Sequence, residues 1–273
     1  MRLVRQALTA PVKLAMNVCA FFPKVDKLRL VELIWKIGRE PEYARLYIGL
    51  TGHKKGIEAA RELAEEVFRE NPSDQVAGMM GALEFGEYNL GRAKNWLEKG
   101  KQCPEKNPES LLWLELNLAD HLDEYDEQAV VTKILSRRDL SMNFTRSALA
   151  VQAEIFLRAR NWDAADAVLE RILRVEDVPA LRWMKWTVAK ARGDEKEAQR
   201  QLNIASTKTH KAIPNIFLAL GWYYLGDIEN TRQYLAKAQR DGITKDRIIQ
   251  INRELGAFLE SDSFAGEKGE TAS

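Results

Sequence analysis

The sequence predicts an all-α protein, built as a solenoid of antiparallel helix pairs. The first observation is a repeat of small residues at intervals of 33 to 36 positions, at Ala60, Ala93, Ala129, Ala165, Ala198 and Thr231. The second is that apolar residues recur every three or four positions on both sides of these landmarks, as on one face of a helix. A period in the mid-thirties with a helix on each side is typical of stacked helix pairs.

The bulk composition fits this class. The chain has 273 residues, of which 45% are hydrophobic and 30% charged, as in soluble proteins made of amphipathic helices. The formal net charge is +1, so no overall field attracts nucleic acid or an acidic substrate. Cys19 and Cys103 are the only cysteines, and their spacing fits neither a disulfide framework nor a zinc site. We therefore expect a cytoplasmic protein. The alternative is a protein that associates with a membrane through its first helix.

Residues 1–40 are predicted to form two apolar, basic helices, over 1–22 and 25–37. The polar residues of 1–22 fall on one narrow stripe. One interpretation is a degenerate first repeat that packs on the following residues. The alternatives are a peripheral membrane anchor, a docking helix for a partner or for the chain's own groove, and a cleaved secretory signal. The residues expected to meet an anionic membrane are Arg2, Leu3, Arg5, Leu8, Lys13, Phe21 and Phe22.

Residues 41–240 are predicted to hold about six helix pairs. Turn residues separate apolar, periodic segments over 43–50 and 57–70, 74–101, 110–118 and 128–135, 147–160 and 164–173, 181–191 and 196–205, and 216–225 and 230–240. Asp163 is a predicted N-cap. The segment 74–101 is less regular, because four glycines weaken its helices: Gly78, Gly81, Gly86 and Gly91.

The carboxy-terminal end is predicted to close the array. Residues 241–260 are expected to form a capping helix, because apolar residues line one side of 243–260 and the end of a solenoid must not expose its stacking face. Residues 261–273 are polar and small, and we expect a disordered tail.

Three strings carry a family resemblance: Lys55-Gly56-Ile57-Glu58-Ala59-Ala60, Asn161-Trp162-Asp163-Ala164-Ala165 and Leu225-Gly226-Asp227-Ile228. Each has an aromatic or aliphatic residue three positions before the small landmark. With Asn71-Pro72 closing one unit, they resemble tetratricopeptide repeats over roughly residues 41–240. The pattern departs from the family at Trp186 and Thr231, where smaller residues are usual. The resemblance implies a right-handed superhelix.

The resemblance also implies which residues line the concave face, at 15, 11, 8 and 7 positions before each landmark. In the amino-terminal half these are Arg45, Gly49, Gly52, His53, Gly78, Ala82, Phe85, Gly86, Leu114, Leu118, His121 and Leu122. The carboxy-terminal half is more aromatic, and its predicted partner-binding residues are Glu154, Arg158, Trp183, Thr187, Lys190, Ile216, Leu220, Tyr223 and Tyr224. The alternative is that a tight superhelix packs these aromatic residues on one another or on residues 243–260.

The chain carries no pattern typical of catalysis. The three histidines are far apart, and no glycine-rich phosphate loop, metal motif or nucleophile constellation is present. We therefore predict a non-enzymatic scaffold or adaptor without a cofactor, a metal or nucleic acid. It would bind a protein partner, such as an amphipathic helix or apolar peptide, in the concave groove. The alternatives are a membrane-peripheral organising protein that self-associates and a structural subunit of a larger complex.

Overall fold

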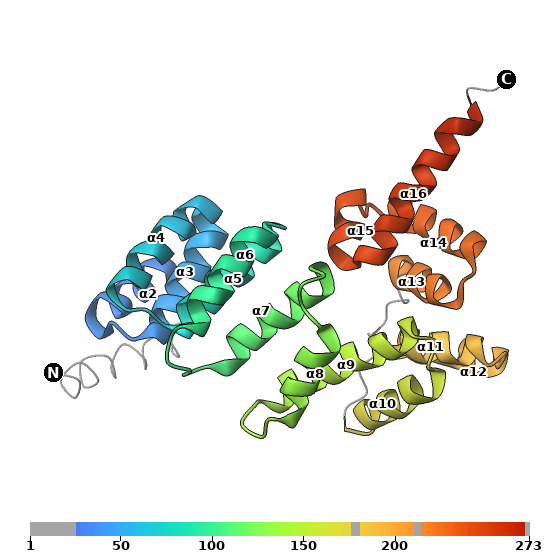
Figure 1. The fold of residues 1–273 in the computed structure, drawn as a ribbon, viewed down its shortest axis with the longest axis horizontal. Coiled ribbons are helices and arrows are strands. Elements are labelled where there is room, and N and C mark those ends of the chain that lie inside the picture. Colours follow the sequence, from blue (N-terminus) through green and yellow to red (C-terminus); the bar gives the residue numbers. More distant parts are fainter. Residues whose placement is uncertain (1–25, 176–180, 210–213, 271–273) are drawn as a thin grey trace. The chain divides into compact units, whose positions relative to one another are not determined.

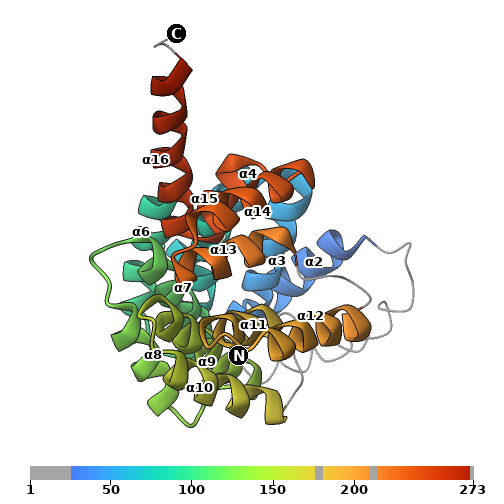
Figure 2. The same cartoon turned by 90° about the vertical axis from the view of Figure 1, so that its right-hand side faces the viewer.

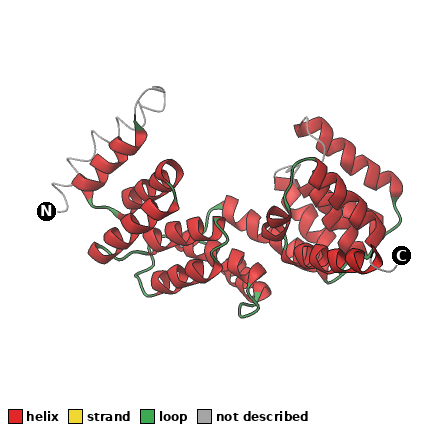
Figure 3. Cartoon of the chain, turned by 90° about the horizontal axis from the view of Figure 1, so that it is seen from above, coloured by secondary structure: helices red, strands yellow, loops and turns green. Residues whose placement is uncertain are grey.

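The computed structural model describes residues 26–175, 181–209 and 214–270, and every regular element within these ranges is a helix (Figures 1 and 3). This confirms the predicted all-α class. The chain forms two compact units that divide between Tyr125 and Asp126. The division falls within the connection formed by residues 122–126, inside the region that the sequence assigns to one continuous array.

Unit 1 contains six described helices: α2 (Lys27–Gly38), α3 (Pro41–Lys55), α4 (Ile57–Glu70), α5 (Asp74–Gly86), α6 (Leu90–Lys101) and α7 (Pro108–His121). Only Gly56, with φ of 92°, separates α3 from α4. Glycine tolerates this conformation, which lets the chain reverse within one residue. Helices α3, α5 and α7 pack in sequence, while α4 and α6 pair with α3 and α5. Helix α2 packs on α3, which is the contact expected if residues 25–37 belong to a degenerate first repeat.

Unit 2 contains nine described helices: α8 (Glu127–Ser136), α9 (Met142–Arg158), α10 (Trp162–Val175), α11 (Arg182–Ala191), α12 (Glu195–Thr209), α13 (Asn215–Leu225), α14 (Ile228–Arg240), α15 (Lys245–Ile251) and α16 (Arg253–Glu270). The closest neighbours are α9 with α10, α11 with α12, and α13 with α14. One apolar core joins residues of α9 to α16. The last turns of α16 project away from the other helices of the unit (Figures 1 and 2).

The repeated small residues lie early in the second helix of successive pairs. Five of the six are at most 1% exposed: Ala60, Ala93, Ala165, Ala198 and Thr231. A small side chain at this position allows the second helix to approach its neighbours closely. Ala129, in α8, is exposed. Ala129 is the first landmark after the division between unit 1 and unit 2.

Local details differ from the sequence prediction at three places. Helix α10 begins at Trp162, and the side chain of Asn161, not that of Asp163, accepts the capping hydrogen bond from the Ala164 N–H (3.2 Å). The expected helix over 243–260 is interrupted at Asn252, whose backbone is extended and whose Oδ1 accepts from the Leu255 N–H (2.9 Å) to cap α16. Helix α16 continues to Glu270, through much of the segment predicted to be a disordered tail.

Candidate functional site

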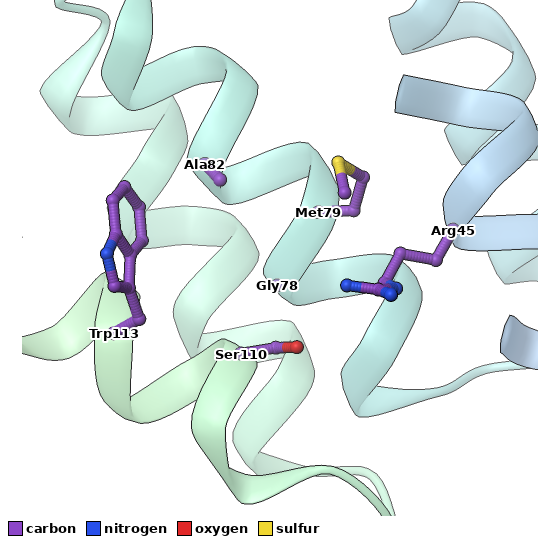
Figure 4. A pocket seen from close by; sticks show the side chains of 6 residues that line it. All are labelled: Arg45, Gly78, Met79, Ala82, Ser110 and Trp113. Carbon is purple, nitrogen blue, oxygen red and sulfur yellow. The ribbon is translucent and has the colours of Figure 1, made fainter. Parts of the chain in front are cut away.

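A pocket of about 180 Å³ opens on the face of unit 1 that α3, α5 and α7 share. Its lining comprises Arg45 of α3, Gly78, Met79 and Ala82 of α5, and Ser110 and Trp113 of α7 (Figure 4). We refer to it as the unit 1 pocket. Sites for whole small molecules occupy roughly 300–1,000 Å³. The unit 1 pocket is therefore of a size to receive one or two side chains of a larger ligand.

The pocket is hollow because its central residues are small. Gly78 has no side chain and Ala82, four positions later, has a single methyl group. A Cβ atom at position 78 would lie 2.5 Å from Ser110 Cβ, closer than real Cβ atoms pack, and 3.2 Å from the Ser110 carbonyl carbon, which is a tight contact. Glycine at this position thus sets the close spacing of α5 and α7, the helices that carry Met79 and Trp113.

Arg45 reaches into the pocket from α3 (Figure 4). Its Nε is buried, and its guanidinium has no hydrogen bond or ion pair with any residue in the described part of the chain. By contrast, Arg39 of unit 1 contacts Glu70 at 2.7 Å and Arg61 binds Glu84 through two nitrogens. A guanidinium offers five N–H donors, and a buried donor without an acceptor costs about 1–3 kcal/mol. The pocket therefore presents a positive charge that an anionic group would neutralise.

Trp113 forms the apolar side of the pocket. Trp113 is 39% exposed, which is unusual for so large an apolar residue. The indole meets Phe85 edge-on, with ring centroids 6.1 Å apart, so unit 1 fixes the ring without covering it. Met79 lies on the same pocket from α5 and supplies a thioether that adapts to different ligand shapes. An aromatic ring and a cation in one depression are the side chains most often found at interaction hot spots.

The sequence identifies only part of this lining. Arg45, Gly78 and Ala82 occur at predicted positions, whereas Leu114, Leu118 and His121 are buried in unit 1. The longer connection after α7 adds residues before the landmark Ala129, so a fixed count back from Ala129 falls short by up to one helical turn and reaches Leu114 instead of Ser110. Ser110 and Trp113 therefore escape the prediction. The signal that finds them is the polar or exposed stripe Ser110, Trp113 and Asn117 on an otherwise buried, leucine-rich helix.

The aromatic and apolar residues predicted to bind a partner lie in unit 2. Four of them are buried, namely Trp183, Ile216, Leu220 and Tyr224, and so is the predicted polar residue Thr187. Trp183 stacks on Phe217 with ring centroids 5.7 Å apart, and Tyr223, which is half-buried, packs at 5.7 Å on Phe258 of α16. In this structure they are core residues. This is the arrangement expected if the aromatic residues pack on one another or on residues 243–260. Their role in partner binding stays a prediction.

The charged members of the predicted set contact residues of unit 2. Arg158 pairs with Glu127 of α8. Lys190 donates to Glu195 at 2.6 Å and lies 5.2 Å from the centre of the Trp222 ring. These cations are therefore neutralised locally, unlike Arg45.

Glu154 belongs to a polar cluster that joins α9, α13 and the α15–α16 junction. The Tyr224 hydroxyl donates to Glu154 Oε1 at 2.8 Å, and Asn252 Nδ2 lies 3.3 Å from the same hydroxyl oxygen. Burial, and then the nearby Glu154 carboxylate, raise the pKa of Tyr224 well above its usual value near 10. The hydroxyl stays protonated at neutral pH, so the cluster links the pairs α9–α10, α13–α14 and α15–α16.

The predicted membrane contacts, Arg2, Leu3, Arg5, Leu8, Lys13, Phe21 and Phe22, lie outside the described residues. Within the described ranges, none of the helices combines the length and apolar character that crossing a bilayer requires. A search of the same residues finds no cluster of three or more His, Cys, Asp or Glu side chains able to hold a metal ion.

We compared the chain with protein-family models, with curated proteins and with solved structures, and none of the three comparisons gave a match.

Proposed function

We propose that this protein is a non-catalytic scaffold of stacked helix pairs, similar to tetratricopeptide repeats, that binds a segment of a partner protein in the unit 1 pocket. Support for the repeat architecture comes from the buried small residues early in the second helices and from the successive packing of α3, α5 and α7. In such arrays the first helices of neighbouring pairs together form one extended binding face.

The observation that carries the proposal is the combination of Arg45 and Trp113 at one pocket. Arg45 has no ionic partner in the described part of the chain, and Trp113 exposes an aromatic surface. Both arrangements are unfavourable in an isolated protein, since one leaves a buried donor unsatisfied and the other keeps an indole in water. A bound segment would relieve both. The pocket's volume of about 180 Å³ suits side-chain anchors of such a segment.

A selection from a phage-displayed library of random 16-residue peptides tests the proposal on the full-length chain. We expect enriched peptides that bind the wild type and lose at least tenfold in affinity for Trp113→Ala. The matched control is Leu33→Ala, which removes a residue of unit 1 that is 51% exposed and lies on α2, away from the pocket.

The two variants separate the pocket from general adhesiveness. Leu33→Ala should retain wild-type affinity for every enriched peptide. Failure to enrich any Trp113-dependent peptide, or equal losses in the two variants, would overturn the assignment of the pocket as the binding surface.

A further inference from the structure

We infer that the segment bound in the unit 1 pocket carries an acidic side chain that pairs with Arg45 and a large apolar side chain that packs on Trp113 and Met79. This inference rests on the proposed function and specifies the chemistry of the partner.

The charge of the pocket selects an acidic ligand. Its six lining residues include one cation and no carboxylate, and Arg45 has no ion pair with any described residue. A ligand Lys or Arg in this pocket would meet an uncompensated like charge, whereas Asp or Glu would form a charge-assisted hydrogen bond. The planar guanidinium offers two parallel N–H groups to one carboxylate. A partly buried pair of this kind is less screened by salt than one on an open surface.

The same argument disfavours the chain's own amino-terminal segment as the occupant. Residues 1–25 carry four basic side chains, Arg2, Arg5, Lys13 and Lys24, and no acidic one. Their charge has the same sign as that of Arg45. The ligand that complements the pocket is therefore a segment of another protein with the opposite charge.

The position of the two anchors sets the spacing in the ligand. Arg45 and Trp113 lie on opposite sides of the pocket, on helices separated by α5 (Figure 4). Packed helices are about 8–10 Å apart, so the two anchors come from helices roughly twice that distance apart. A ligand that reaches both must place its acidic and apolar side chains several residues apart in sequence. Gly78 and Ala82 leave room for the ligand backbone between them.

The test uses the peptides selected from the random 16-residue library on the full-length chain. Each Trp113-dependent peptide is compared with a version in which one Asp or Glu is replaced by Asn or Gln. Affinities for the wild type and for Arg45→Gln are measured by fluorescence anisotropy. We expect one acidic position whose neutralisation weakens binding to the wild type at least tenfold and changes binding to Arg45→Gln less than twofold. Thermal unfolding of Arg45→Gln confirms that the variant is folded.

The outcomes separate the inference from the proposed function. Trp113-dependent peptides that lack an acidic residue, or that bind equally well after every neutralisation, overturn the inference and leave the proposed function intact. An equal loss on the wild type and on Arg45→Gln places the carboxylate elsewhere and also overturns it. Absence of Trp113-dependent peptides overturns both.

Discussion

Substitution of Gly78 by alanine tests the packing that underlies the pocket. On helix propensity alone, this change inside α5 should stabilise the protein by roughly 0.5–1 kcal/mol. The structure predicts the opposite sign. A Cβ atom at position 78 would lie 2.5 Å from Ser110 Cβ and 3.2 Å from the Ser110 carbonyl carbon, so relief requires a shift of the α7 backbone.

The magnitude follows from the cost of overpacking. Inserting a methyl group into a closely packed contact costs about 1–3 kcal/mol. After subtraction of the propensity gain, the net loss in unit 1 is on the order of 1 kcal/mol. For a unit of about 100 residues, a loss of that size lowers the melting temperature by roughly 4–8 °C.

The assay is thermal unfolding by circular dichroism, with hydrogen exchange of peptides from α5 and α7 to localise the effect in unit 1. Gly91→Ala is the control, because position 91 also lies in a helix and an added Cβ there has no heavy atom within 4 Å. We expect Gly91→Ala to match or exceed the wild type in stability. If Gly78→Ala were equally stable, the close approach of α5 and α7 would be refuted.

Three further changes have expected outcomes. Glu84→Ala removes the carboxylate that binds Arg61 at 2.7 and 2.9 Å, and it should lower the free energy of unfolding by about 3 kcal/mol, measured by urea titration, since Arg61 loses its buried partner. Tyr224→Phe should cost about 1 kcal/mol at pH 8 through loss of the hydrogen bond to Glu154. Because the folded-state pKa of Tyr224 is raised, the wild type should lose stability as pH rises above 10, by up to about 1.4 kcal/mol per pH unit, and the gap to Tyr224→Phe should close between urea titrations at pH 8 and 11. Trp113→Ala should change the melting temperature by less than about 4 °C, because the residue is 39% exposed, while it weakens peptide binding at least tenfold.

The helices could be predicted from the sequence because their signals are local. Periodic apolar residues and turn residues such as Gly56 specify each helix pair, and the small landmarks report where second helices pack closely. The pocket residues Arg45, Gly78 and Ala82 lie in pairs with regular spacing, where counting from the landmark is accurate.

The rest depends on contacts between distant residues. Trp113 escaped prediction because the longer connection after α7 shifts the register of that pair. Gly78 was expected to weaken its helix, but its role is set by Ser110, 32 positions later. The burial of Tyr224 depends on Glu154 and Asn252, which are 70 positions before and 28 positions after it. A helical pattern specifies an apolar face without specifying what covers that face.

Photo-crosslinking through methionine tests the assignment of the unit 1 pocket most directly. The full-length chain is produced with photo-methionine, irradiated in an extract of its native cells, and the crosslinked positions are mapped by mass spectrometry. Met79 lines the pocket, whereas Met142 is 66% exposed on unit 2 and serves as an internal control within the same molecule. We predict that partner adducts form mainly at Met79 and disappear in Arg45→Glu. If the yield of adducts instead follows solvent exposure, Met142 will be labelled more than Met79. That result, or adducts at Met79 that persist in Arg45→Glu, would contradict the assignment of the unit 1 pocket as the binding surface.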